Sequence, residues 1–143
     1  LCLRLILAFE FMTAGWSKVQ GNNWFADVQP RFLFPFSALS VELNWSLAVA
    51  VELVGGGLLV LGLGTRYAAL ALMALTVVAA VAVHFPADWQ TLGELWQGYA
   101  VSNQGQGNFK LPLLFLLMLL VLVSQGPGKL SVDHLIARRF GLA

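Results

Sequence analysis

Two acidic side chains stand out because each lies inside a long apolar stretch of the sequence. Glu10 is flanked by LCLRLILAF and FMTAGW, and Glu52 lies between LAVAV and LVGGGLLVL. An ionised carboxylate at the centre of a bilayer costs roughly 2.5–3.5 kcal/mol, so each acid requires a stabilising partner or a function. Acids in such positions relay protons or bind ligands, and we take both residues as candidate catalytic groups.

The spacing of polar residues places the two acids at similar depths. Glu10 lies eight residues before Lys18, and Glu52 lies eight residues after Asn44. Eight residues span about 12 Å of helix at a rise of about 1.5 Å per residue. If the two helices run antiparallel, we expect the carboxyl groups to meet and either share a proton or bind a carbonyl-type ligand.

Small residues on the same helical faces favour this close approach. Gly55 and Gly56 lie one turn after Glu52 and predict tight helix packing in a membrane. The GGG run lies inside an apolar stretch, so we interpret it as a packing motif and not as a phosphate-binding loop. The alternative for each acid is a structural one, in which a neutral side chain bonds a neighbouring helix or pairs with Arg4.

His84 is the third candidate catalytic residue. It ends an apolar run, and imidazole is a side chain that titrates near neutral pH. It would shuttle protons, bind a metal or hydrogen-bond a quinone carbonyl, or else be an ordinary interfacial histidine. Polar and aromatic residues at the same side of the membrane are candidate ligand-binding groups, with snorkelling as the alternative for the lysines. They are Lys18, Asn44, Trp45 and Lys110.

The sequence predicts no metal site and no resident cofactor. Cys2 is the single cysteine, and HxxxH, ExxH, haem, flavin, P-loop and dinucleotide-binding patterns are absent. The acids and His84 could instead hydrogen-bond a carbonyl-type ligand, such as the head group of a quinone.

Composition points to a protein that spans a membrane several times. Of 143 residues, 59% are hydrophobic and 10% are charged, and the net charge of +1 offers no basic surface for nucleic acid. Four stretches are long and apolar enough to be membrane helices. They run from Leu1 to about Trp16, from Ser37 or Ser40 to Leu63, from Tyr67 to Phe85, and from Leu111 to about Ser124. We therefore predict a single all-α domain over residues 1–143, a four-helix membrane bundle with a retained first helix.

Charge and tryptophan distribution predict its orientation. Four spans put both termini on one side, together with Arg4, Arg66, Lys129, Arg138 and Arg139. The other side receives Lys18, Arg31 and Lys110, and all five tryptophans. The positive-inside rule then places both termini in the cytoplasm.

Short helices are expected at both surfaces. Asn23 would cap a helix around Trp24, and Asp88 would cap one that carries Trp89 and Trp96. Residues 102–108 read as a mobile turn. Ser131 would cap an amphipathic tail helix whose apolar residues lie opposite Arg138 and Arg139 and face the cytoplasmic leaflet. These apolar residues are Val132, Leu135, Ile136 and Phe140.

Polar and glycine residues near the cytoplasmic ends complete the pattern. Arg66 is a positive-inside anchor or part of a site, and Gly126 and Gly128 end the fourth span. Asp133 would pair with Lys129 or Arg66, or stabilise the start of the tail helix.

These pieces, in this order, resemble the DoxX family of small four-helix membrane proteins. The resemblance rests on AGWSK at 14–18, ELVGG at 52–56, LLVLG at 58–62, Thr65-Arg66, His84, and GPGKLSVD at 126–133. Further stretches resemble one branch of that family, encoded beside copper-responsive, ribosomally made and modified peptides. They are PFS at 35–37, LNW at 43–45, HFPADW at 84–89 and GNFKLP at 107–112.

The resemblance implies a subunit of a quinone- or redox-linked membrane complex, in which a protein partner supplies electrons. The alternative is a non-catalytic membrane partner in maturation or export of the copper-responsive peptide, docking through the outer loops or the basic tail. A third option, a small transporter or metal conduit, would need a homo-oligomer.

Overall fold

All regular secondary structure in the described residues, which are 1–86, 88–99 and 107–140, is helical in the computed structural model. The chain forms the four-helix bundle that the apolar stretches predict. Its long helices are α1 (Cys2–Gln20), α3 (Val41–Leu61), α4 (Thr65–Ala79), which continues into the π-helical turn η3 (Ala80–His84), and α6 (Lys110–Gln125). Each predicted span is confirmed as a helix, with its ends displaced by a few residues.

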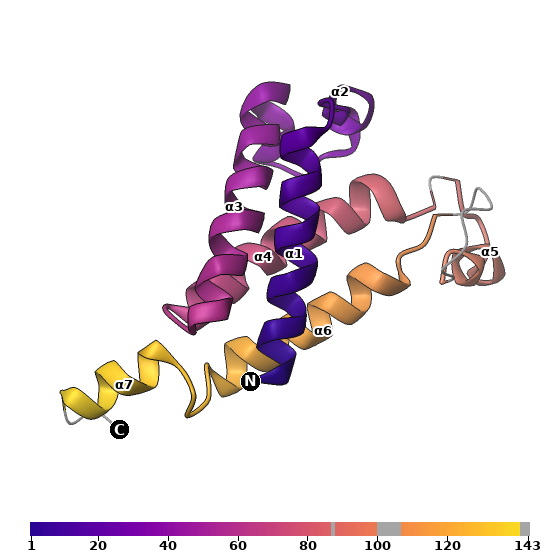
Figure 1. The fold of residues 1–143 in the computed structure, drawn as a ribbon. Helices are drawn as coiled ribbons and strands as arrows, with labels where there is room; N and C mark the ends of the chain where they lie inside the picture. The colour runs from indigo at the N-terminus through magenta and orange to yellow at the C-terminus, as the bar shows by residue number, and fades with distance from the viewer. Residues whose placement is uncertain (87, 100–106, 141–143) are drawn as a thin grey trace.

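The bundle consists of two helix pairs that cross (Figure 1). Helix α1 packs along α3, α4 packs along α6, and α3 joins the two pairs through its contact with α4. Contact between α1 and α6 is slight by comparison. The pairs therefore diverge toward one end of the molecule, where residues 21–40 connect α1 with α3.

Local sequence signals define where α3 begins and ends. The Ser40 hydroxyl accepts a hydrogen bond from the backbone N–H of Leu43 at 3.2 Å, which caps the first turn. Gly62 ends the helix in the left-handed conformation at φ 68°, a region that glycine enters without steric cost. The chain can therefore reverse within three residues and begin α4 at Thr65.

Glycines on α3 let the neighbouring helices approach closely, as predicted. A methyl group added at Gly56 would lie 3.2 Å from the carbonyl oxygen of Ala8 and would overlap Met12. A methyl group at Gly55 would lie 3.1 Å from Leu72 of α4. The two adjacent glycines thus lie at different helix contacts, Gly56 against α1 and Gly55 against α4.

Two of the helical segments have the length and hydropathy to cross a membrane, Val41–Leu61 and Thr65–His84, and Lys110–Gln125 is a shorter apolar helix. The interior is packed by a continuous apolar cluster. Its members are Leu7, Ala8, Phe11, Leu59, Ala68, Ala69, Leu72, Leu119 and Leu122. Large apolar side chains such as Phe9 and Val54 are exposed on the outside of the helices, where lipid would cover them.

We name the two ends of the bundle by their residues. The tryptophan end carries Trp16, Trp24, Trp45, Trp89 and Trp96, and the basic end carries Arg4, Arg66, Lys129, Arg138 and Arg139. Short elements at the tryptophan end are α2 (Phe25–Val28), η1 (Gln29–Arg31), η2 (Phe36–Ala38) and α5 (Leu92–Gln97). At the basic end, α7 (Val132–Arg139) leads away from the bundle near the N-terminus (Figure 1).

The predicted cap at Ser131 is confirmed, since its hydroxyl accepts from the His134 N–H at 3.1 Å. The prediction for Asn23 was wrong by one residue, because Trp24 is the N-cap residue of α2, although the Asn23 side chain accepts from the Phe25 N–H at 3.0 Å just before the helix. The prediction for Asp88 was wrong, since Thr91 caps α5 and forms a capping box with Glu94. Most of the turn predicted at 102–108 lies outside the described residues.

Candidate functional site

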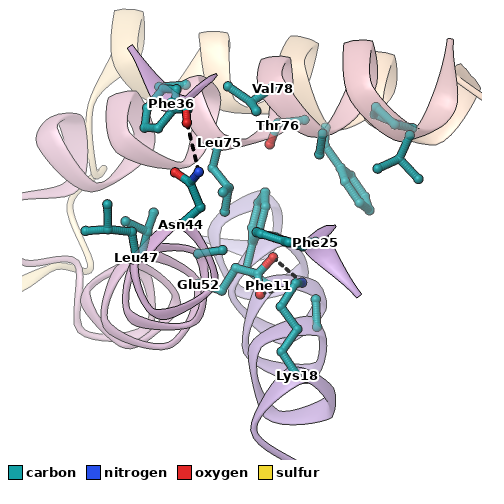
Figure 2. A pocket seen from close by; sticks show the side chains of 18 of the residues that line it. Phe11, Lys18, Phe25, Phe36, Asn44, Leu47, Glu52, Leu75, Thr76 and Val78 are labelled. Carbon is teal, nitrogen blue, oxygen red and sulfur yellow. Dashed lines mark hydrogen bonds and ion pairs between the residues drawn. The ribbon is translucent and has the colours of Figure 1, made fainter. Parts of the chain in front are cut away.

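A cavity of about 350 Å³ lies at the tryptophan end, between the two diverging helix pairs. All four long helices and the loop before α3 contribute to its wall, which is mostly aromatic and aliphatic (Figure 2). The aromatic lining residues are Phe11, Trp24, Phe25, Phe32, Phe36 and Phe115. The polar lining residues are Glu10, Lys18, Asn44, Glu52, Thr76 and His84, so most of the predicted site residues meet at one cavity.

An ion pair between α1 and α3 forms part of this wall. The Lys18 ammonium donates to Glu52 Oε1 at 2.7 Å and to Oε2 at 2.8 Å (Figure 2). The side chains are 17% and 8% exposed, so the pair is largely removed from solvent. An ammonium group has three N–H donors, and these two bonds leave the third available to a ligand.

Close helix packing at Gly15 makes this ion pair possible. A methyl group at Gly15 would lie 3.0 Å from Glu52 Cβ and 2.9 Å from Leu53 Cγ. The backbones of α1 and α3 therefore approach closely at the level of Glu52. The flexible stem of Lys18 then brings its ammonium group to both carboxylate oxygens.

The predicted carboxylate pair is replaced by this lysine–glutamate pair. Gly56 faces Ala8 and Met12, so Glu10 lies at the level of Gly56, one turn of α3 away from Glu52. The spacing argument failed because Lys18 and Asn44, from which both depths were measured, do not lie at one level. Glu10 is exposed on its own helix and lines the same cavity.

The structural alternative proposed that one of the acids pairs with Arg4. In the described structure Arg4 pairs with neither of them. It lies at the basic end, 2% exposed, and donates to the carbonyl oxygens of Pro127 and Leu130 at 2.8 Å each. Its charge therefore stabilises the turn between α6 and α7.

Asn44 links α3 to the preceding loop. Its amide nitrogen donates to Gln29 Oε1 at 3.0 Å and to the Phe36 carbonyl at 2.8 Å, and its Oδ1 is buried without a partner among the described residues. Trp45 packs edge-on against Phe25, at 5.0 Å between ring centroids. Trp45 therefore supports a residue of the cavity wall without lining the cavity itself.

His84 is oriented by a residue that the sequence did not identify. Its Nδ1 lies 2.6 Å from Asn108 Oδ1, across the connection between α4 and α6. Because an amide oxygen only accepts, Nδ1 is the donor in this contact, which leaves Nε2 for another partner. Gly107, at φ 75°, packs directly on the His84 carbonyl and permits this approach. His84 also ends a π-helical turn, a feature that occurs often at functional sites.

Lys110 lies apart from the cavity lining. Its ammonium group is 5.2 Å from the centroid of the Tyr99 ring, a cation–π arrangement. Tyr99 continues into an aromatic stack with Trp96 and Phe109. The structure therefore gives Lys110 a packing role at the start of α6 and does not support it as a ligand-binding residue.

Asp133 caps a helix far away in the sequence. Its carboxylate oxygens accept from the backbone N–H groups of Gly64 at 2.8 Å and Thr65 at 3.0 Å, at the beginning of α4. Its hydrogen-bond partners are thus neither Lys129 nor Arg66, and the helix it caps is α4. Asp133 also lies in the first turn of α7, where the sequence predicted that its charge favours the start of the tail helix. A carboxylate at this position complements the unpaired N–H groups and the positive end of the helix dipole.

The remaining motif residues at the basic end also have structural contacts. Arg66 is exposed and donates to the Ser124 carbonyl at 3.3 Å. Gly126 adopts φ 75° against the Arg66 side chain, and Gly128 adopts φ 79°. These residues close the turn that connects α6 with α7.

Within residues 1–86, 88–99 and 107–140, no group of three His, Cys, Asp or Glu side chains is arranged to hold a metal ion. The polar groups at the cavity are an ammonium–carboxylate pair, an imidazole, a second carboxylate and an amide. They can donate and accept hydrogen bonds and move protons, and the surrounding wall suits an apolar ring.

The fold and the cavity define a small helical membrane protein with a candidate ligand site at one end of the bundle. Comparison with known proteins identifies the family of this membrane protein. The family model named DoxX matches residues 1–85, which is more than half of the chain. The chain therefore belongs to the DoxX family.

A relative from Haemophilus influenzae is 43% identical over 138 residues, which cover 96% of this chain and 83% of that protein. The relative is described only as an uncharacterized protein. No solved structure matches the chain. The family match contains Lys18, Glu52 and His84, whereas Asn108 and Asp133 follow it in the sequence.

Proposed function

We propose that this protein is a subunit of a quinone-linked membrane complex and that its cavity binds the quinone head group. The observation that carries the proposal is the Lys18–Glu52 ion pair on the wall of an otherwise apolar cavity. Burying two charges costs several kcal/mol per ion before their attraction is counted, so a ligand role gives a reason for placing them there.

The pair is electrically neutral as a unit, which favours a neutral ligand over an anion or a cation. The third N–H of Lys18 would donate to a quinone carbonyl oxygen, and the ring would pack against the aromatic wall, where Phe11 and Phe115 already contact one another at 5.8 Å between ring centroids. Cavities that bind small molecules occupy roughly 300–1,000 Å³, and about 350 Å³ suits a head group whose isoprenoid tail remains in lipid.

Reduction of a quinone to a quinol consumes two electrons and two protons. A redox partner protein would supply the electrons, since this sequence contains no haem or flavin motif. Glu10 and His84 line the cavity and are the groups that we assign to proton delivery. The Nδ1–H bond of His84 to Asn108 directs the other ring nitrogen, Nε2, as the proton acceptor or donor.

The proposal also includes an orientation in the bacterial cytoplasmic membrane. Five cationic residues gather at the basic end, and the three at the tryptophan end include Lys18, which Glu52 neutralises. By the positive-inside rule, the basic end and both termini are cytoplasmic. The cavity then lies in the outer half of the membrane.

Quinone titration of the purified protein in nanodiscs tests this function. Decylubiquinone and a dimethylnaphthoquinone should quench tryptophan fluorescence saturably, because Trp24 lines the cavity, and Trp24→Phe should remove most of the signal. Lys18→Gln and Glu52→Gln should each weaken binding at least about tenfold, the cost of one charge-assisted hydrogen bond. Lys110→Gln is the matched control and should bind normally.

Quenching that never saturates, or that is equal in the wild type and in Lys18→Gln, would overturn the proposal. A thermal melt of each variant, compared with the wild type, separates lost binding from lost folding. In the assembled complex, quinone reduction that is unchanged by Glu52→Gln would contradict the same role.

A second candidate is a non-catalytic partner in maturation or export of a copper-responsive modified peptide. The exposed side of α5 favours it, with Leu92 78%, Trp96 68% and nearby Trp89 44% exposed. Deleting residues 88–108 should then abolish co-purification of the peptide machinery, whereas Glu10→Gln and Glu52→Gln should not affect it. Binding that survives the deletion rules this candidate out.

A further inference from the structure

The outward side of α7 carries large apolar side chains that no other part of the described bundle covers. Leu135 is 63% exposed, Ile136 44% and Phe140 70%, and Leu130 just before the helix is 71% exposed. Four such side chains within eleven residues form an apolar surface at the basic end. An isolated exposed leucine is ordinary, but a contiguous group of this kind marks a binding surface.

The bundle holds α7 in one orientation. Asp133 bonds the first turn of α4, and its own N–H donates to the Gly62 carbonyl at 3.0 Å. The Ser131 hydroxyl donates to the Gly128 carbonyl at 2.7 Å, and Arg4 bonds the carbonyls on either side of that segment. Because these contacts fix the start of α7, its outward side is a defined surface and not that of a loose tail.

Basic side chains surround this apolar surface. Arg138 and Arg139 are exposed on the last turn of the same helix, whereas Asp133 on its first turn faces the bundle. Lys129 and Arg66 are also exposed at this end. Asp133 is the single acid between residues 107 and 140, and its two oxygens are already bonded to α4.

We propose that α7 and its basic neighbours form a binding surface for the anionic phospholipids of the adjacent leaflet. Leu135, Ile136 and Phe140 would enter the boundary between headgroups and acyl chains, as the apolar side of an interfacial helix does. The arginine side chains are long enough to reach phosphate groups from beside an apolar surface. An anionic bilayer offers phosphate groups to the positive charges and acyl chains to the exposed apolar side chains. This double match favours lipid over a protein partner.

The surface is independent of the quinone cavity, since it lies at the opposite end of the bundle. Each basic residue near an anionic membrane strengthens association about fivefold. Two arginines together would therefore raise the local excess of anionic over neutral lipid by up to about 25-fold, and high salt would reduce it.

Lipid-specific quenching of a label on α7 tests the proposal in the full chain. A Cys2→Ser background removes the single cysteine, and Leu135→Cys then carries an environment-sensitive fluorophore. In phosphatidylcholine nanodiscs, traces of nitroxide-labelled phosphatidylglycerol should quench this label at least fivefold more strongly than nitroxide-labelled phosphatidylcholine. Arg138→Gln with Arg139→Gln, or high salt, should remove the difference.

A label at Leu92→Cys on α5 is the matched control, because it is exposed at the other end of the molecule. It should show no preference between the two quenching lipids. Equal quenching by both lipids at Leu135→Cys would overturn the proposal, as would a label that only aqueous iodide reaches. A label that neither lipid nor iodide reaches would show a protein contact instead, and would also overturn it.

Discussion

The two ends of the bundle use buried polar groups in opposite ways. At the basic end, Arg4 and Asp133 bond the backbone of their own chain. Arg4 closes the turn between α6 and α7, and Asp133 caps α4. At the tryptophan end, Lys18 and Glu52 bond one another on the wall of a cavity and leave a donor free. The comparison teaches that a buried charge bonded to backbone serves the fold, whereas a buried charge pair on a cavity wall is a candidate for ligand binding.

The largest expected effect comes from leaving Glu52 without its cation. Lys18→Met should destabilise the protein by about 3–5 kcal/mol, because it leaves a carboxylate that is 8% exposed uncompensated. The double variant Lys18→Met/Glu52→Leu should recover most of this stability while quinone binding stays lost. Thermal unfolding in detergent measures the first effect, and fluorescence titration measures the second.

Glu10→Gln is the control for this prediction, because Glu10 is an exposed acid without that ion pair. It should change the unfolding midpoint little. If the double variant remained as unstable as Lys18→Met, packing and not charge would explain the loss. If it bound quinone normally, the tryptophan end would be no more functional than the basic end.

A slightly smaller effect is expected when the basic end is disrupted sterically. Gly62→Ala places a methyl group against the Arg4 guanidinium and 2.6 Å from Ser131 Cβ, at a residue with φ 68°. We expect a loss of about 3 kcal/mol, of which left-handed strain supplies about 1–2 kcal/mol. Thermal unfolding in the same detergent measures it.

Gly64→Ala separates the two causes of that loss. Gly64 also has positive φ, at 56°, but an added methyl group would meet nothing within 4 Å. This variant should lose only the strain part, about 1–2 kcal/mol. Equal losses in both variants would mean that the contacts among Gly62, Arg4 and Ser131 contribute little.

Removing the Asp133 charge should have an intermediate effect. Asp133→Asn keeps one acceptor oxygen but loses the second bond to α4 and the favourable charge at its N-terminus. We expect a loss of about 1–2 kcal/mol in unfolding free energy and unchanged quinone affinity. A variant that binds quinone more weakly at unchanged stability would contradict the division between the two ends.

The sequence predicted the helices well because their signals are local. Apolar runs of sufficient length, a serine cap at Ser40 and turn glycines at Gly62 and Gly126 define most boundaries without tertiary information. The importance of Glu52 was equally visible, since a carboxylate in an apolar helix is costly wherever its partner lies.

The partners were not predictable, because they depend on helix register and on contacts between distant segments. Glu52 meets Lys18 and not Glu10 because Gly15 and Gly56 set how far α1 slides along α3. Asp133 reaches Gly64 across 69 residues, and His84 meets Asn108 across 24. Spacing within one helix contains no information about these distances.

The smallest predicted effect concerns a lysine at the tryptophan end that lies outside the cavity lining. Lys110→Gln removes the cation over the Tyr99 ring, which should lower stability by about 0.5–1 kcal/mol, as for an exposed cation–π pair. Quinone affinity should be unchanged, because Lys110 does not line the cavity. Since Lys18→Gln and Lys110→Gln make the same chemical change at one end of the molecule, a tenfold difference in binding between them would locate the ligand at the ion pair. Equal weakening would instead indicate a general effect of positive charge at this end.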